Sequence, residues 1–261
     1  MKPTLSEVET LAREAGEILR LGYGNRHQVD HKGIIDLVTE VDNRSEGFLL
    51  GEILRRYPDH KVLAEESGAS AGEDCCLWYV DPLDGTVNYA HGVPIFSVAL
   101  AYQEGGEVLL GVVYDPLRDE CFSAKKGIGA WLNGEEIRVS TVSDLDQSLL
   151  VTGFPYDVRT NPDNNLEYFN RFALLTQGVR RLGSAALDLC YVAAGRFDGF
   201  WEIRLNPWDV AAGGLIAQEA GALVTDLRGG QDYLTQPLSI LAANPFIHTA
   251  MLAILKERSE L

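Results

Sequence analysis

Two aspartates, a glycine and a threonine fall within residues 81–86, Asp-Pro-Leu-Asp-Gly-Thr. The apolar run at residues 77–80, Leu-Trp-Tyr-Val, precedes them directly and predicts a buried strand. Carboxylates packed this closely repel each other, and a bound cation removes the repulsion. Because carboxylate oxygens are hard ligands, the segment predicts a site for Mg²⁺, Ca²⁺ or Mn²⁺ rather than for zinc.

Further acids stand at the expected ends of strands or starts of helices. Glu65 follows a short apolar strand, and Asp209 lies in the segment Pro-Trp-Asp at the start of a predicted helix. A weaker acidic segment, residues 35–42, contains Asp36 and Asp42. A single acid in such a place is ordinarily a turn residue or a helix N-cap. That interpretation weakens for the pair in residues 81–86, because the preceding strand implies burial.

The spacing of these acids separates them from three common motifs. An EF-hand requires Asp-x-Asp-x-Asp-Gly with a later Glu, and residues 81–86 lack that alternation. Phosphatases that form an aspartyl-phosphate use Asp-x-Asp, whereas two residues separate Asp81 from Asp84. The sequence also lacks the P-loop pattern of nucleotide-binding proteins.

Composition bounds the class of protein. The chain has 261 residues, 46% of them hydrophobic, and a formal net charge of −16. We expect a single unit over residues 1–261, with a soft internal division near residues 141–147. The negative charge argues against nucleic-acid partners, and no apolar run of about 20 residues predicts a membrane span. Four cysteines without metal or disulfide spacing fit a reduced, cytoplasmic protein.

Hydrophobic periodicity predicts the elements that must position the acids. Strand signals dominate residues 88–140 and predict an antiparallel sheet, and the second half alternates helices and strands as in α/β layers. The predicted helices cover residues 5–21, 42–57, 164–177, 184–195 and 207–221, and a last helix starts near residue 245. The other predicted strands cover residues 62–64, 149–152, 197–203, 223–226 and 239–242.

Three segments together resemble the inositol monophosphatase family. They are Glu-Glu-Ser at 65–67, Trp-x-x-Asp-Pro-Leu-Asp-Gly-Thr-x-Asn-Tyr at 78–89, and Trp-Asp-x-Ala-Ala-Gly at 208–213. The resemblance implies an α+β / α/β layered sandwich (α-β-α-β-α) of the sugar-phosphatase type. It also implies a lithium-sensitive, Mg²⁺-dependent phosphomonoesterase assembled as a homodimer.

The resemblance implies a site for two or three Mg²⁺ ions, with Mn²⁺ as an alternative. Glu65, Asp81 and the carbonyl of Leu83 resemble the ligands of the first ion, and Asp81, Asp84 and Asp209 resemble those of the second. A third ion would lie near Glu65.

The family roles also imply a catalytic pair and an outer shell. Glu65 and Thr86 are similar to the residues that orient and activate the attacking water. Asp36 and Asp42 are candidates for the outer shell of the third ion.

Substrate contacts are likewise implied by matching segments. Glu202 matches a carboxylate that accepts hydrogen bonds from sugar hydroxyls, although a strand-end acid is an equal alternative. Residues 183–186, Gly-Ser-Ala-Ala, match a substrate-facing backbone, although Gly-Ser is also an ordinary helix start. For Arg204 the sequence leaves open a place in the pocket, a pair with Glu202 or exposure to solvent. The implied substrate-binding residues are Asp84, Gly85, Thr86, Gly183, Ser184, Ala185, Glu202 and Asp209.

The leading interpretation is a phosphatase that hydrolyses myo-inositol monophosphate or a related phosphorylated sugar or polyol by in-line attack of metal-activated water. A fructose-1,6-bisphosphatase or a dual-specificity enzyme is the nearest alternative. A catalytically silent, metal-binding regulatory protein is the alternative from a different class.

Overall fold

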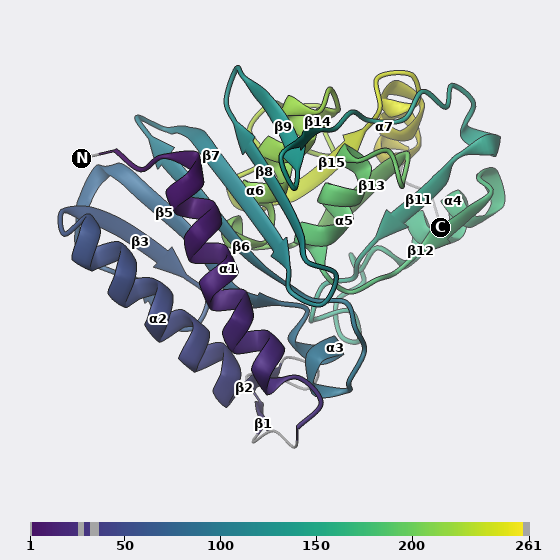
Figure 1. Ribbon diagram of the computed structural model, residues 1–261. Coiled ribbons are helices and arrows are strands. Elements are labelled where there is room, and N and C mark those ends of the chain that lie inside the picture. Colours follow the sequence, from purple (N-terminus) through teal and green to yellow (C-terminus); the bar gives the residue numbers. More distant parts are fainter. Residues whose placement is uncertain (1, 26–28, 32–36, 258–261) are drawn as a thin grey trace.

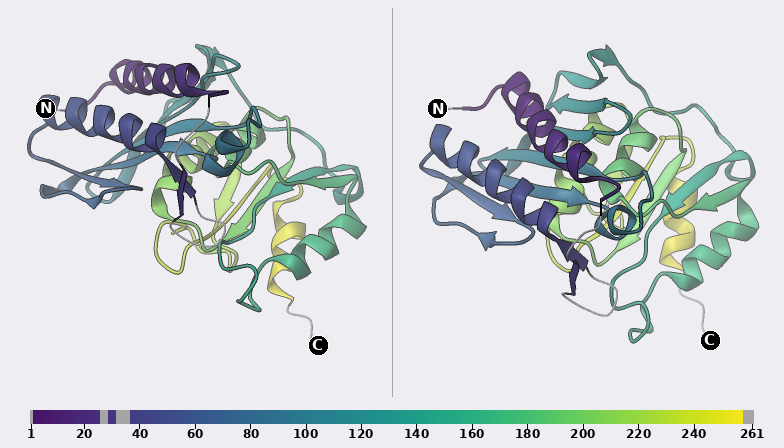
Figure 2. Two further views of the ribbon diagram at one scale, coloured as in Figure 1. Left: turned by 90° about the horizontal axis from the view of Figure 1, so that it is seen from below. Right: turned by 60° about the horizontal axis from the view of Figure 1, so that its bottom comes forward.

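Helices and sheets alternate in five layers in the structure, a computed structural model (Figure 1, Figure 2). It describes residues 2–25, 29–31 and 37–257. The layers are a helix pair, an eight-stranded sheet, a second helix pair, a five-stranded sheet and a third helix pair. The expected α-β-α-β-α sandwich is therefore confirmed.

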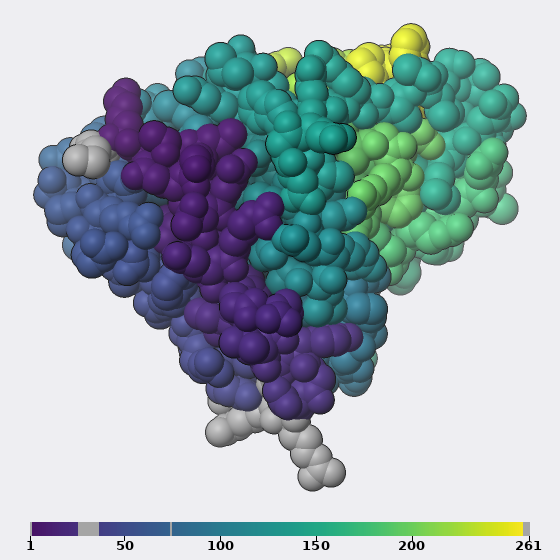
Figure 3. Space-filling model, viewed as in Figure 1, coloured from purple at the N-terminus to yellow at the C-terminus, as the bar shows by residue number. Residues whose placement is uncertain are grey.

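Helices α1 (Leu5–Gly22) and α2 (Glu40–Arg56) form the first layer and cover one face of the larger sheet (Figure 3). Thr4 and Glu7 close the predicted capping box of α1, and Thr39 and Asp42 close a second box at α2. The apolar faces of both helices pack on the sheet in one buried cluster that includes Trp78 and Val80 of the central strand.

The larger sheet is antiparallel apart from one pair of strands. Its central strand β5 (Glu73–Asp84) pairs in parallel with β3 (His60–Ala64) and antiparallel with β6 (Ser97–Glu104). Both parallel strands thus end at the same edge of the sheet, where their acids follow. In spatial order the remaining strands are β10 (Glu135–Glu136), β9 (Gly129–Leu132), β8 (Glu120–Lys125) and β7 (Glu107–Asp115) on the far side of β6, and β4 (Gly68–Ala69) beyond β3.

The two sheets enclose helices α5 (Ala185–Ala193) and α6 (Pro207–Glu219). Their residues form the largest buried cluster, which includes side chains of both sheets. Helices α4 (Leu166–Leu175) and α7 (His248–Lys256) cover the outer face of the smaller sheet. In spatial order that sheet contains β12 (Gly178–Arg180), β11 (Leu149–Thr152), β13 (Gly199–Ile203), β15 (Ser239–Ala243) and β14 (Leu223–Thr225).

Short elements complete the chain. Strand β1 (Val29–His31) pairs with β2 (Leu37–Thr39), and helix α3 (Thr86–Ala90) follows β5 directly. A 3₁₀ turn at Leu145–Gln147 lies between the strands of the two sheets, where the sequence predicts a soft division. No helix among the described residues is long and apolar enough to span a membrane.

The predicted elements are confirmed, with differences at their ends. The central strand β5 continues through Asp84, whereas the apolar pattern predicts an end at Val80. The last helix begins at His248, three residues after its predicted start. Strands β1, β2, β4, β10 and β12 have three residues or fewer and carry no periodic signal that would predict them.

Candidate active site

The motif at residues 81–86 forms the end of β5 and the turn into α3. The pairing with β6 is irregular between Asp81 and Asp84, so the two carboxylates leave the regular alternation of the strand. Gly85 has φ +94°, and a Cβ there would lie 2.9 Å from the carbonyl oxygen of Ile95. Only glycine fits this turn without strain, because it tolerates both the left-handed backbone and the close approach.

Helix α2 holds the two acidic loops together. Ser45 Oγ donates a hydrogen bond of 2.9 Å to the carbonyl of Pro82. The buried carboxylate of Glu46 accepts hydrogen bonds from the backbone N–H groups of Glu66 (2.8 Å) and Ser67 (2.9 Å). Adjacent side chains of one helix therefore fix the loop that carries Glu65 beside the end of β5.

Thr86 and Asp42 form a buried hydrogen-bonded pair. Thr86 Oγ1 lies 2.9 Å from Asp42 Oδ1 and 3.0 Å from the carbonyl oxygen of Leu83. Burial raises the pKa of Asp42, while hydrogen bonds from Thr39 and Thr86 oppose the rise. The sequence suggests only an outer-shell place for Asp42, and this link to Thr86 is not predicted from it. Asp36, the other outer-shell candidate, lies outside the described residues.

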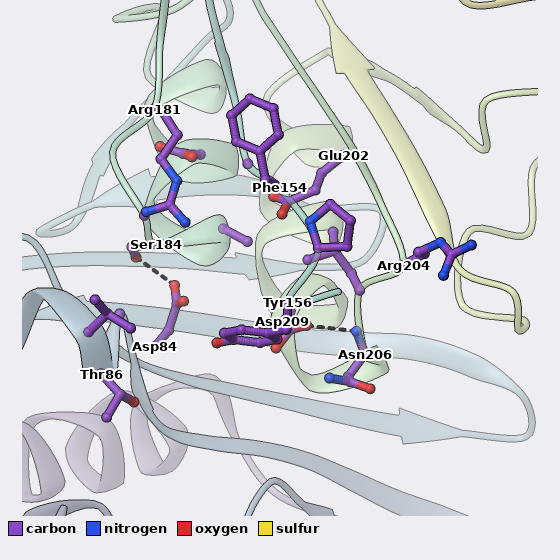
Figure 4. A pocket seen from close by; sticks show the side chains of 18 residues that line it. Asp84, Thr86, Phe154, Tyr156, Arg181, Ser184, Glu202, Arg204, Asn206 and Asp209 are labelled. Atoms are coloured by element: carbon purple, nitrogen blue, oxygen red, sulfur yellow. Dashed lines mark hydrogen bonds between the residues drawn. The ribbon is translucent and has the colours of Figure 1, made fainter. Parts of the chain in front are cut away.

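The second half of the chain closes over Asp84. Ser184 is the N-cap of α5, and its Oγ donates a 2.5 Å hydrogen bond to Asp84 Oδ2 (Figure 4). The backbone N–H of Ala186 donates to the same oxygen at 2.9 Å. Ser184 thus caps the helix and also contacts a predicted site residue. The substrate-facing backbone of this segment stays a prediction. The amide of Asn88 adds a further link by donating to the carbonyl of Leu182 at 2.8 Å.

These contacts surround one pocket between the two sheets, which we call the acidic pocket. It brings together all the predicted substrate-binding residues, while Glu65, Asp81 and Leu83 lie beside it rather than in its wall. The residues that line the acidic pocket are Asp84, Gly85, Thr86, Val87, Gly153, Phe154, Pro155, Tyr156, Arg181, Gly183, Ser184, Ala185, Asp188, Glu202, Arg204, Leu205, Asn206 and Asp209.

Glu202 lies in the wall opposite Asp84 (Figure 4). It belongs to β13, where it pairs with Ile240, and it is 6% exposed. A Cβ on Gly153 would lie 2.2 Å from Glu202 Oε1. The absence of a side chain at Gly153 therefore makes room for the carboxyl group of Glu202. Glu202 thus lies near the end of a strand and also lines the pocket.

Arg204 does not pair with Glu202. Its Nη1 donates to Asp157 Oδ2 at 2.6 Å, and its guanidinium group points away from Asp84 and Ser184 (Figure 4). The ion pair ties the loop after β11 to the end of β13. Arg204 and Arg181 both line the pocket, and Arg181 lies beside Gly183.

The acids of this region raise one another's pKa values. Burial raises the pKa of Asp81 well above its usual range, and the charges of Glu65, Asp84 and Asp209 raise it further. Burial likewise raises the pKa of Asp84 to about 6, against the hydrogen bonds from Ser184 and Ala186.

The same causes act on the far side of the pocket. Burial raises the pKa of Asp209 well above its usual range, against a hydrogen bond from the N–H of Asn206. Burial also raises the pKa of Glu202 to about 8, with Arg181 opposing the rise and Asp84 adding to it. The negative charges are thus close enough to repel each other across the two halves of the chain.

The chemistry of these donors fits hard divalent cations. In the described part of the chain, no three His, Cys, Asp or Glu side chains already converge on one metal position. Hydrogen bonds among the described residues occupy Oδ1 of Asp81, Oδ2 of Asp84 and Oδ2 of Asp209. A cation bound by the other oxygens of these carboxylates would remove the repulsion that raises their pKa values.

The chain belongs to the inositol monophosphatase family, whose family model matches residues 1–260. It is 42% identical over 260 residues to the protein named Nus factor SuhB of Salmonella typhimurium, covering 98% of this chain and 97% of that one. It is also 42% identical to a protein of Mesorhizobium japonicum named inositol-1-monophosphatase, covering 95% of this chain and 91% of that one. The solved structure of inositol monophosphatase from Anabaena (Nostoc) superposes with a TM-score of 0.87 at 43% identity, covering 98% and 96% of the two chains.

Proposed function

We propose that the chain is a Mg²⁺-dependent phosphatase that hydrolyses myo-inositol monophosphate or a related sugar phosphate. The observation that carries the proposal is the acidic pocket, where acids from both halves of the chain meet beside the pair of Thr86 and Asp42. Membership of the inositol monophosphatase family supports phosphatase activity. The residues that would hold the metal are Glu65, Asp81, Leu83, Asp84 and Asp209, and Mn²⁺ fits the same oxygen donors.

Bound Mg²⁺ would lower the pKa of the attacking water and offset the charge of the phosphate. Thr86 would accept a proton from that water while its own hydroxyl proton passes to Asp42 Oδ1, so that the carboxylate is the final proton acceptor. Glu65 would orient the same water from the loop that Glu46 holds in place. Glu202 and the backbone beside Ser184 would position the leaving alcohol.

Phosphate release from a panel of esters tests this function. With Mg²⁺, and in parallel Mn²⁺, myo-inositol 1-phosphate should be hydrolysed with a higher kcat/KM than fructose 1,6-bisphosphate. The reverse order would favour the bisphosphatase alternative, and release from neither ester would refute the proposal. Inhibition by Li⁺ is expected in the same assay, because a small monovalent cation would compete for the same acidic ligands.

A regulatory protein without turnover is the second candidate function. The Salmonella relative at 42% identity is named a Nus factor, which favours this alternative. The observation against it is the buried hydrogen bond from Thr86 to Asp42, because metal binding alone does not need a proton acceptor for water. Calorimetry that detects Mg²⁺ binding, together with an assay that detects no phosphate release, would favour regulation.

We also propose a homodimer in the cytoplasm, which light scattering and cell fractionation would test.

A further inference from the structure

Asp188 is a buried acid in the wall of the acidic pocket for which the proposed reaction has no use. It lies on α5, one turn after Ser184, and is 1% exposed. Its Oδ1 atom is buried and has no hydrogen-bond partner among the described residues. Leaving such an oxygen unpaired costs free energy, so the position calls for a partner from outside the protein.

The groups that face Asp188 do not supply that partner. Burial raises the pKa of Asp188 well above its usual range, and the charges of Glu202 and Asp84 raise it further. The charge of Arg181 opposes the rise, but Oδ1 of Asp188 has no hydrogen-bond partner among the described residues. Two carboxyl groups from different elements, Asp188 of α5 and Glu202 of β13, therefore line the same pocket and repel each other.

Gly153 gives the carboxyl group of Glu202 its place in the wall of the pocket. Any side chain there would overlap Glu202, since a Cβ would lie 2.2 Å from its Oε1 and 2.3 Å from its Oε2. Gly153 itself lines the pocket together with both acids. The missing side chain at Gly153 thus leaves the room that the carboxyl group of Glu202 occupies in the wall of the pocket.

We propose that Asp188 binds a hydroxyl group of the substrate alcohol, in addition to the contact expected of Glu202, and so strengthens the selection of phosphate esters of polyols. The inference rests on the proposed function and adds Asp188 as a residue that determines specificity. A polyol has neighbouring hydroxyl groups that each donate and accept a hydrogen bond, which matches two adjacent carboxyl groups. An ester whose alcohol lacks hydroxyl groups leaves both acids without partners and loses affinity for that reason.

Substitution of Asp188 by alanine and by asparagine tests the proposal. The kcat/KM of each variant with Mg²⁺ is measured for myo-inositol 1-phosphate and for p-nitrophenyl phosphate, whose alcohol has no further hydroxyl group. Asp188→Ala should lower kcat/KM for the inositol ester about tenfold or more, mainly through KM, and should change it less than about twofold for the nitrophenyl ester. Asp188→Asn should recover most of the loss, because its amide also forms hydrogen bonds. Cys190→Ala, a buried truncation on the same helix outside the pocket, is the matched control and should affect both esters equally.

Calorimetry with Ca²⁺ in place of Mg²⁺ separates this proposal from the proposed function. The wild type should bind myo-inositol 1-phosphate more tightly than inorganic phosphate, and Asp188→Ala should remove that difference whether or not the protein turns over. Equal losses for both esters in Asp188→Ala, or an unchanged binding difference, would overturn the role of Asp188. Absence of phosphate release by the wild type would overturn the proposed function alone.

Discussion

Asp84 is the residue at which the two halves of the chain meet, because it belongs to β5 and accepts hydrogen bonds from the start of α5. Asp84→Asn keeps the shape of the side chain and a carbonyl oxygen for those hydrogen bonds, but removes the charge that a divalent cation needs. We expect kcat for myo-inositol 1-phosphate to fall by about 10²–10³-fold or more. Phosphate release measures the loss, and the melting temperature should stay within a few degrees of the wild type.

The exposed acid Asp146, in the 3₁₀ turn between the sheets, provides the control for this substitution. Asp146→Asn removes the same charge at a residue that does not line the pocket and should leave kcat unchanged. Near wild-type turnover in Asp84→Asn would show that its carboxylate holds no essential metal.

Thr86 lies between a buried carboxylate and a carbonyl, and its hydroxyl group is within hydrogen-bond distance of both. Thr86→Val preserves the volume and removes the hydroxyl group. We expect kcat to fall by about 10²-fold or more with a small change in KM, because proton transfer belongs to the transition state. Thr86→Ser should regain much of the rate. A turnover of Thr86→Val close to that of the wild type would show that the hydroxyl group has no part in proton transfer.

The sequence reveals those site residues that lie close together along the chain. Asp81, Asp84 and Thr86 stand within six residues and attract attention as a motif. Asp42 bonds to Thr86 across 44 positions of the chain, and a capping acid is its ordinary interpretation. Asp188 looks like any polar residue of a helix and Gly153 like any loop residue. Their roles arise only when α5, β11 and β13 are packed together.

At the scale of elements, α2 fixes the loop of Glu65 through the buried carboxylate of Glu46. Glu46→Gln keeps the length of the side chain but weakens two hydrogen bonds that the charged group accepts. We expect the free energy of unfolding to fall by about 1–3 kcal/mol and kcat to fall about tenfold, because the loop loses its support. Urea unfolding and phosphate release measure the two effects.

Glu52 on the same helix is the matched control. It pairs with Arg55 and Arg56 on the surface of α2, away from the loop. Glu52→Gln should change stability by about 0.5 kcal/mol or less and leave kcat unchanged. A loss of activity in both variants would point to α2 as a whole rather than to the contact with residues 66 and 67.

The elements themselves were largely predictable, because their apolar faces repeat with the period of a helix or strand. Helix α1 shows this with its capping box and its buried stripe. The end of β5 was not predictable, since its last four residues, 81–84, leave the alternating pattern to form the site. Short edge strands such as β12 depend on neighbours that the local sequence does not specify.

At the scale of the whole molecule, packing two sheets around α5 and α6 places acids from distant segments in one buried region. Burial therefore raises the pKa values of these acids, so that over a range of pH they stay protonated in the folded protein but lose their protons in the unfolded chain. The pKa of Asp84 rises from 3.8 to about 6, and that of Glu202 rises from 4.5 to about 8. Both groups contribute full stability below about pH 4, and their contribution is lost as the pH rises through the folded pKa values.

Metal-free protein should accordingly lose stability between about pH 4 and pH 8, by about 1.4 kcal/mol per pH unit for each proton that only the folded state holds. Mg²⁺ should restore more stability at pH 8 than at pH 5, because the cation takes the place of those protons. Urea unfolding with EDTA or with excess Mg²⁺ at several pH values measures both effects. Glu202→Gln should remove the part of the decline near pH 8, since its amide does not titrate. A metal-free stability that rises with pH over this range would contradict the mutual repulsion of the buried acids.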